Sequence, residues 1–268
     1  NYQFPERAAA TFKAMADYRK WRQRPAREMP ELTVDKAAVE ELFAKAHAEN
    51  RLALGDFEAR AVMEAYGLRI PKSVLARTAD EAVEVAESIG YPVVLKIASP
   101  DILHKSDIGA VKIGLSDATQ VRDAFDIIMY RAGRYMPSAD IWGCTVQEMV
   151  AKGKEVIIGM SKDPQFGPLL LFGLGGIYVE VLKDVTFRVA PISRQEASEM
   201  ISEIRSFPLL RGVRGEKPSD LEAAIDALLR VSQLVTDFPE IVELDVNPLM
   251  IHERGAVAVD MRIILGER

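Results

Sequence analysis

Hydrophobic and polar positions change their spacing near residue 70, and that change locates the predicted elements. Before it, apolar residues recur at helical spacing, which predicts amphipathic helices at 35–49 and 56–66. After it, short runs of alternating or continuous apolar residues predict strands at 73–76, 93–98 and 111–115. The first half of the chain therefore mixes helices and strands.

Capping residues mark the expected starts of the helices. A hydroxyl residue followed three positions later by glutamate pairs free backbone N–H groups with side chains. That spacing predicts helix starts at Thr78, Ser193 and Ser219, and lone caps predict starts at Asp56 and Ser116. In chain order, the helices that begin at Asp56, Thr78, Ser116, Ser193 and Ser219 are expected to end near Gly67, Gly90, Gly133, 206 and 237.

The second half is richer in strands. Runs at 145–150 and 155–162 predict strands, and the run PQFGPLLLFGLGG at 164–176 predicts a buried strand that ends in a glycine loop. Two β-rich runs, 241–251 and 256–265, flank a short turn and predict a hairpin. The order of elements favours an α+β fold with two lobes. We expect a helical arm at 1–30, a helical entry plus first lobe at 31–143, and a second lobe at 144–268.

Composition narrows the possible partners and location. A net charge of −6 argues against a nucleic-acid surface, and the near-apolar run 167–177 is too short to cross a membrane. The single cysteine, Cys144, cannot form an internal disulfide and favours a reducing, cytoplasmic location. Because the chain starts at Asn1 rather than Met, we expect it to be part of a longer protein.

Two residues in the stretch YPVVLKIASPDILHKSDIGAV suggest phosphate chemistry. Lys96 lies in an apolar strand, where a buried ammonium needs an anion. His104 follows eight residues later in a polar loop. The alternatives are a lysine that reaches past the sheet edge and an ordinary loop histidine.

The terminal hairpin predicts a cation site. If the hairpin is symmetric about the bond between Glu253 and Arg254, Asn247 lies opposite Asp260, and Asp245 shares their face. Magnesium prefers such oxygen ligands in small number. The alternative is a cross-strand polar pair on a solvated face.

Each of the other candidate site residues has an ordinary structural explanation as well as a functional one. Glu148 lies where the lobes are expected to meet, and its backbone or carboxylate could contact a base or a ribose. The sequence lacks a P-loop, and Tyr178 replaces the last glycine of a dinucleotide-binding motif, so Gly173, Gly175 and Gly176 are candidates for a phosphate-binding loop or a simple turn. Arg188 could contact phosphate or pair with a carboxylate.

These blocks together resemble the ATP-grasp part of the ADP-forming acyl-CoA synthetases, which include the ADP-forming acetate–CoA ligases. The resemblance runs from about 52 to 265, through VVLKIASPDILHKSDIGAVKIGL, VQEMVAKGKEVIIGM and IVELDVNPLMI. It implies a two-lobed ATP-grasp fold after a helical arm. Residues 1–27 resemble the end of the CoA-binding half in fused members, so a CoA-binding partner is implied, with a homo- or hetero-oligomer expected.

The resemblance also implies a reaction and a role for each residue. Acyl-CoA and phosphate give an acyl phosphate, a histidine of the CoA-binding half accepts the phosphoryl group, and His104 carries it to ADP. Lys96 would clamp the phosphates, Glu148 would mark the adenine hinge, and Asp245 would orient His104. The implied ligands of Mg²⁺ are Asn247 and Asp260, with Gly173, Gly175, Gly176 and Arg188 near the nucleotide, ADP or ATP.

One departure and two alternatives accompany this interpretation. The family loop commonly has two glycines where this chain has Gly109 and Ala110, and alanine disfavours a positive φ. A non-catalytic module that senses nucleotide or acyl-CoA within a fused protein acetyltransferase is one alternative. A carboxylate–amine ligase on the same fold, which needs no phosphorylated histidine, is the other.

Overall fold

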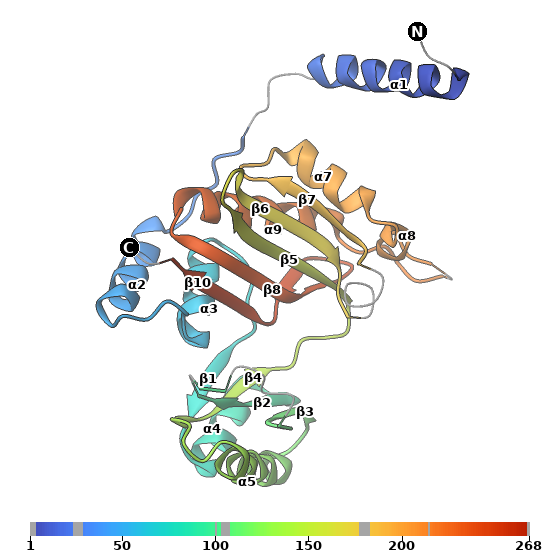
Figure 1. Cartoon of the computed structure of the whole chain (residues 1–268). Helices are drawn as coiled ribbons and strands as arrows, with labels where there is room; N and C mark the ends of the chain where they lie inside the picture. Colours follow the sequence, from blue (N-terminus) through green and yellow to red (C-terminus); the bar gives the residue numbers. More distant parts are fainter. Residues whose placement is uncertain are drawn as a thin grey trace.

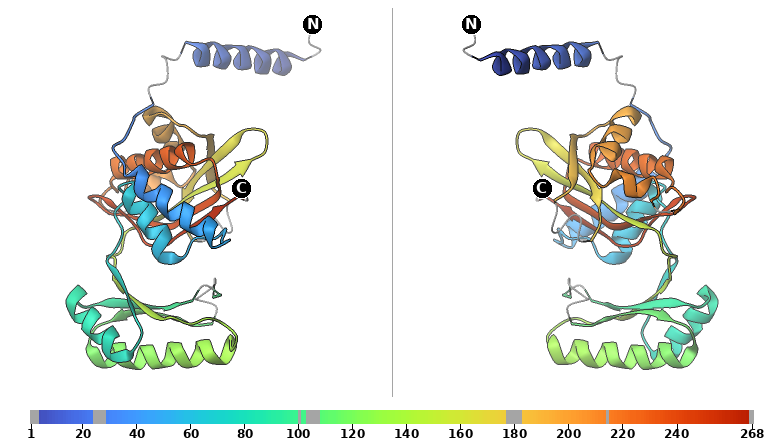
Figure 2. Two further views of the ribbon diagram at one scale, coloured as in Figure 1. Left: turned by 90° about the vertical axis from the view of Figure 1, so that its left-hand side faces the viewer. Right: turned by 90° about the vertical axis from the view of Figure 1, so that its right-hand side faces the viewer.

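The described residues form two antiparallel sheets, each with its own hydrophobic core (Figure 1). A computed structural model describes residues 4–23, 29–99, 101–102, 108–176, 183–213 and 215–266. Helix α1 (Pro5–Arg22) lies apart from both sheets in all three views (Figures 1 and 2). Within the described residues, none of the helices combines the length and the apolar character needed to span a membrane.

The smaller sheet has four strands in the order β1-β4-β2-β3. Its strands are β1 (Ser73–Ala76), β4 (Gly143–Glu148), β2 (Val93–Ala98) and β3 (Val111–Leu115). Helices α4 (Ala79–Ile89) and α5 (Ala118–Tyr135) cover one face, where alternate strand residues such as Leu95 and Val146 are fully buried. Lys96 and Thr145, which pair across β2 and β4, therefore lie on the opposite face.

The larger sheet has six strands, with β10-β8-β5-β6-β7 in order and β9 paired to β8. Its strands are β5 (Lys154–Asp163), β6 (Gly167–Leu174), β7 (Val185–Val189), β8 (Ile241–Ile251), β9 (Ala256–Ala258) and β10 (Met261–Leu265). The helices that follow β7 are α7 (Arg194–Glu203), α8 (Phe207–Leu210) and α9 (Leu221–Asp237). The entry helices α2 (Lys36–Ala48) and α3 (Asp56–Ala65) join the same core.

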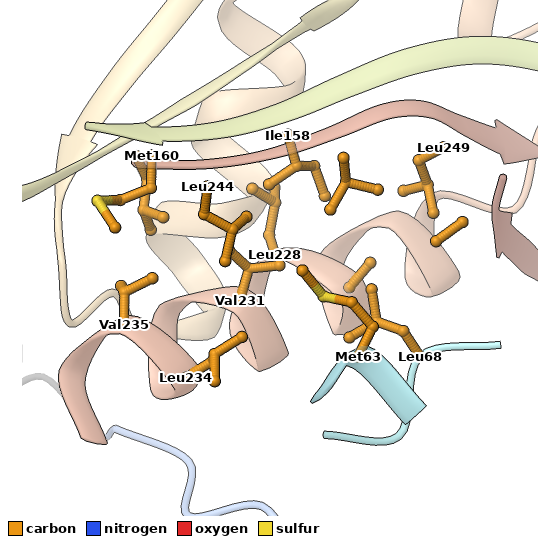
Figure 3. Packing of buried hydrophobic residues seen from close by; sticks show 14 of the residues in the cluster. Met63, Leu68, Ile158, Met160, Leu228, Val231, Leu234, Val235, Leu244 and Leu249 are labelled. Carbon is orange, nitrogen blue, oxygen red and sulfur yellow. The ribbon is translucent and has the colours of Figure 1, made fainter. Parts of the chain in front are cut away.

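Helix α9 is central to this core (Figure 3). Its apolar stripe, which includes Leu228 and Val231, packs against Ile158 of β5 and Leu244 of β8, while Met63 of α3 closes one side. All five side chains are fully or almost fully buried. Each contributes about 1.5–3 kcal/mol by leaving water, so this layer fixes the sheet that carries the hairpin.

The distribution of the two cores differs from the predicted lobe boundaries. Helices α2 and α3, expected as the helical entry that precedes the first lobe within 31–143, pack on the larger sheet through residues such as Phe43 and Met63. Strand β4, expected to open the lobe at 144–268, is hydrogen-bonded to β1 and β2 of the smaller sheet. An amphipathic pattern shows that an element is buried on one face, but it does not specify which sheet covers that face.

The hydroxyl caps were predicted correctly at two of three helices. Thr78 caps α4 and Ser193 caps α7, each side chain accepting a hydrogen bond from the backbone N–H three residues on. At the other starts a neighbour is the cap: Gly55 at α3, Asp117 at α5 and Asp220 at α9. The two aspartates bring a negative charge to the positive end of the helix dipole, which favours them over the adjacent serines.

The strands at 73–76, 93–98, 111–115 and 241–251 were predicted with the bounds observed, and the hairpin is confirmed with an interruption. Its returning strand is divided into β9 and β10 by Val259 and Asp260. Of the predicted helix ends, Gly90 is the C-cap of α4, whereas α5 continues past Gly133 to Tyr135 and α7 ends at Glu203.

Candidate functional site

Lys96 extends from the smaller sheet toward the larger one. Strand β2 lies between β4 and β3, so Lys96 is on an interior strand and does not reach past a sheet edge. Its side chain is 12% exposed, and its Nζ lies 4.0 Å from Oδ2 of Asp260, which belongs to the terminal hairpin. The structure therefore brings together two predicted site residues that are 164 positions apart in the sequence.

Asn247 and Asp260 face each other across the hairpin, as predicted. The backbone N–H of Asn247 donates to the carbonyl of Asp260 at 3.0 Å, and the paired positions on either side keep the same register. Both residues are exposed. Hard oxygen donors on an accessible face suit Mg²⁺, with phosphate and water oxygens completing its coordination. No group of three His, Cys, Asp or Glu side chains with metal-binding geometry occurs in the described ranges.

Asp245 lies on the same face as Asn247, and its carboxyl group has a perturbed pKa. Leu244 and Val246 point into the core, so the alternate residues of β8 point away from it. Burial, followed by the negative charges of Glu243 and Asp260, raises the pKa of Asp245 to about 6, while Arg262 opposes the shift. This carboxyl group changes its protonation state close to neutral pH.

Glu148 is the last residue of β4, where the chain leaves the smaller sheet for β5. Its backbone N–H donates to the carbonyl of Lys72 at 2.8 Å, and its Oε2 accepts from the N–H of Lys72 at 3.2 Å. The carboxylate is thus engaged with backbone beside its own sheet. The backbone after Glu148 is the part that lies at the crossing between the lobes.

The three glycines differ in what their backbones do. Gly173 is part of β6 and pairs with Ile157 and Val185. The N–H of Gly175 donates to the carbonyl of Glu155 at 2.8 Å, so it serves the sheet. Gly176 has a φ of +61°, and residues 177–182 lie outside the described residues.

Arg188 is not brought to the other candidates. Its Nη2 donates to Oε1 of Glu203 on α7 at 2.6 Å and lies 4.0 Å from Glu199. Strand β7 is at the opposite end of the sheet order from β10, and Arg188 pairs with buried Leu170, on the helix-covered face. The geometry matches the carboxylate-pairing interpretation of Arg188.

His104 and its neighbours at 103–107 lie outside the described residues. The segment follows Ile102, which is buried, and precedes Ile108. Gly109 has a φ of +64°, whereas Ala110 does not have a positive φ. The carbonyl of Ala110 accepts a hydrogen bond from the N–H of Ile97 at 3.0 Å. Alanine is therefore compatible with the backbone at position 110.

Sequence reasoning missed one residue next to this site. Arg60 of α3 contacts both Gln147 of β4 and the carbonyl of Val259, the residue before Asp260. A single arginine in an amphipathic helix is ordinarily solvent-exposed, so its sequence context gave no signal. Only the packing of α3 against β10 brings Arg60 to the lobe junction.

Comparison with known proteins identifies the family. The family model for the ATP-grasp domain matches residues 45–265. The β subunit of ADP-forming acetate–CoA ligase I from Pyrococcus furiosus is 50% identical over 229 residues, which cover 85% of this chain and 98% of that subunit. The ADP-forming acetate–CoA ligase I of Archaeoglobus fulgidus is 46% identical over all of this chain but only 39% of its own length.

Solved structures show the same relationship. The acetyl-coenzyme A synthetase 1 of Ca. Korarchaeum cryptofilum, in complex with coenzyme A, Ca-AMPCP and HgCl⁺, has 45% sequence identity and a TM-score of 0.82, covering 84% of this chain and 99% of that one. A second structure of that protein, with coenzyme A and Mg-AMPPCP, has its phosphohistidine segment pointing towards the nucleotide binding site; its TM-score is 0.75 at 42% identity, with 85% and 99% coverage.

These matches agree with the predicted resemblance, and they lend no support to the alternative of a sensing module. The relatives occur as separate subunits or as parts of longer chains. The protein belongs to the ATP-grasp family and is the ATP-grasp component of an ADP-forming acyl-CoA synthetase.

Proposed function

We propose that this chain binds ADP or ATP together with Mg²⁺ between its two sheets and exchanges a phosphoryl group between the nucleotide and His104. The observation that carries the proposal is the approach of Lys96 to Asp260, because it sets a cation of one sheet against the oxygen donors of the other. Phosphoryl transfer depends on such positioning and on compensation of the charge on the phosphate oxygens.

The residues have distinct roles in this proposal. Lys96 binds the nucleotide phosphates, and Asn247 and Asp260 hold Mg²⁺. When bound there, the metal would supply positive charge to offset that of the phosphates. The backbone after Glu148 would lie along the base, and Gly176, at the end of the Gly173–Gly176 segment, would approach the phosphates. We assign no nucleotide contact to Arg188, whose guanidinium pairs with Glu203 of α7.

His104 is the proposed phosphoryl carrier. In the direction of ATP use, an imidazole nitrogen attacks the terminal phosphorus, the bond to the bridging oxygen breaks, and ADP leaves with the electron pair. Asp245 is the proposed partner of His104 when the loop docks. Since the pKa of Asp245 is about 6, its carboxylate form predominates at pH 7 and accepts an imidazole N–H. In the similar Korarchaeum structure the phosphohistidine segment points towards the nucleotide binding site, which supports this assignment.

The remaining step requires a second body. A CoA-binding half, as a separate subunit or in the same polypeptide, would form the acyl phosphate from acyl-CoA and phosphate and pass the phosphoryl group to His104. The occurrence of relatives as separate β subunits and as parts of longer ligases supports both arrangements. We place the assembled enzyme in the cytoplasm because its substrates are nucleotides and CoA thioesters.

Calorimetric titration of the chain with ADP tests the nucleotide site. We expect one site per chain, with tighter binding in Mg²⁺ than in EDTA and weaker binding of AMP, which lacks the phosphate nearest the metal. Absence of ADP binding by folded protein in Mg²⁺ would contradict the proposed function.

A further inference from the structure

Arg60 is the buried charged residue at the junction of the two lobes. It is 4% exposed, although it lies on the fifth position of α3. Its Nε pairs with Oδ2 of Asp56 at 3.1 Å, one helical turn earlier. A buried guanidinium is costly unless its N–H groups are paired, so its contacts decide what it contributes.

The remaining contacts of Arg60 span both lobes. Its Nη2 donates to Oε1 of Gln147 at 2.9 Å and to the carbonyl of Val259 at 3.3 Å. Gln147 belongs to the smaller sheet and is 1% exposed, whereas Val259 lies in the break between β9 and β10 of the larger sheet. One nitrogen of Arg60 therefore joins the two sheets at a single point.

Each of these two contacts lies close to a residue of the nucleotide site. Val259 directly precedes Asp260. Gln147 pairs with Val94 of β2, and Thr145, two residues earlier, pairs with Lys96, so these four side chains share the sheet face that looks toward the hairpin. A shift of Gln147 relative to Val259 would thus change the distance between Lys96 and Asp260.

A purely structural role explains this arrangement less well. Nη1 of Arg60 is buried and has no hydrogen-bond partner among the described residues. An unpaired buried donor lowers stability, and an apolar residue of similar volume would avoid that loss. The planar fork of arginine is what allows one side chain to bind Asp56, Gln147 and a backbone carbonyl together.

We propose that Arg60 is a positioning residue of the nucleotide site, which sets the separation of Lys96 and Asp260 by holding Gln147 and the Val259 carbonyl. This inference rests on the proposed binding of ADP and Mg²⁺ between the sheets. Arg60 does not touch the nucleotide. Its effect is exerted through Asp260, so it is largest on the metal dependence of binding.

The test compares Arg60→Met and Gln147→Leu with a matched control, Arg230→Met. Arg230 of α9 also pairs with an aspartate one turn earlier, at 2.6 Å, and donates to a carbonyl, that of Tyr66, at 2.8 Å, but both contacts stay within the larger lobe. Calorimetry measures the affinity for ADP at several Mg²⁺ concentrations, and thermal unfolding measures the stability of each variant.

We expect the Mg²⁺ concentration needed for half-maximal ADP affinity to rise about tenfold or more in both Arg60→Met and Gln147→Leu, as for other residues that orient metal ligands. In the double variant the Mg²⁺ requirement should rise no further than in the stronger single variant, because both changes break the same link between the sheets. Arg60→Lys should fall between Arg60→Met and the wild type, since an ammonium keeps the charge without the fork.

Three results overturn the inference. If Arg230→Met raises the Mg²⁺ requirement as much as Arg60→Met does, the effect is general destabilisation. If Arg60→Met and Gln147→Leu bind Mg²⁺ and ADP like the wild type, the inference fails while the proposed function stands. If the wild-type chain binds no ADP, the proposed function fails and this inference fails with it. Should Arg60→Met not fold, Gln147→Leu alone decides between these outcomes.

Discussion

The Nζ of Lys96 lies 4.0 Å from Oδ2 of Asp260, although the two residues belong to different sheets. The lysine side chain is 12% exposed and the aspartate 52%, so a mostly buried ammonium faces a largely solvated carboxylate. Such a pair contributes little to stability because the exposed partner keeps its water. Its significance is that a cation of the smaller sheet meets the oxygen donors of the hairpin, the groups that a ligand with phosphate and metal requires.

Lys96→Met should abolish tight nucleotide binding and leave the fold intact. Removing the cation leaves the phosphates without a partner on the smaller sheet, and we expect ADP affinity to fall about tenfold to a hundredfold. Titration calorimetry measures the loss. Lys162→Met is the control, because within the described ranges Lys162 donates only to the carbonyl of Pro239. Equal ADP affinities in the two variants would show that Lys96 does not bind the nucleotide.

Asp260→Asn should weaken the effect of Mg²⁺ rather than the binding of metal-free ADP. The amide keeps one oxygen but loses the negative charge that a small divalent cation requires. The measurement is the ADP affinity in Mg²⁺ and in EDTA. Glu243→Gln is a suitable control on the same face, because Glu243 pairs with Arg262 at 3.6 Å. A uniform loss under both conditions would argue against metal binding by Asp260.

Asp245 should make the stability of the chain fall as pH rises. Because its folded-state pKa is about 6, above the ordinary value of 3.8, the folded chain holds the proton more tightly. Its contribution is fully present below pH 4 and is lost as pH rises through 6, by up to about 3 kcal/mol. Asp245→Asn should therefore gain stability relative to the wild type between pH 4 and 7.

Urea unfolding at pH 4 and pH 7.5 measures this difference. Asp163→Asn is the control of opposite sign, since backbone N–H groups of Phe166 and Gln165 lower the pKa of Asp163. Because the folded-state pKa of Asp163 lies below its ordinary value of 3.8, its contribution is nearly complete by pH 4, and the difference between Asp163→Asn and the wild type should be almost the same at pH 4 and pH 7.5. The account of Asp245 is wrong if the difference between Asp245→Asn and the wild type is the same at both pH values.

Gly143→Ala should destabilise the smaller sheet. Gly143 has a φ of +131°, and a Cβ there would overlap the carbonyl oxygen of Ala76. Strain of this kind costs about 1–3 kcal/mol, before the overlap is counted. Gly133→Ala, in α5 with open space around a Cβ, should instead add about 0.5–1 kcal/mol. Urea unfolding compares the two, and equal stabilities would contradict the backbone geometry at Gly143.

Local patterns predicted the elements well because their causes are local. The alternation in β2 and the spacing of Ser193 and Glu196 act over a few residues, and the hairpin register follows from a turn. Asn247 and Asp260 could therefore be paired from the sequence.

Relationships between lobes were not predictable in the same way. Nothing near Arg60 in the sequence indicates that α3 packs beside β10, and nothing near Cys144 assigns β4 to the smaller sheet. These placements depend on which apolar faces meet in the folded chain. Asp117 is the N-cap of α5 rather than Ser116, and the two residue types differ little in N-cap propensity, so the sequence alone does not decide between them.

The central claim, that this component carries a phosphoryl group on His104, is tested most directly by incubating the chain with γ-labelled ATP and Mg²⁺. We predict label on the protein that survives base and is lost in acid, as expected of a phosphohistidine. It should be absent from His104→Ala, strongly reduced in Lys96→Met and unchanged in His252→Ala. A folded, ATP-binding wild-type chain that takes up no label, or equal labelling of His104→Ala, would contradict the account.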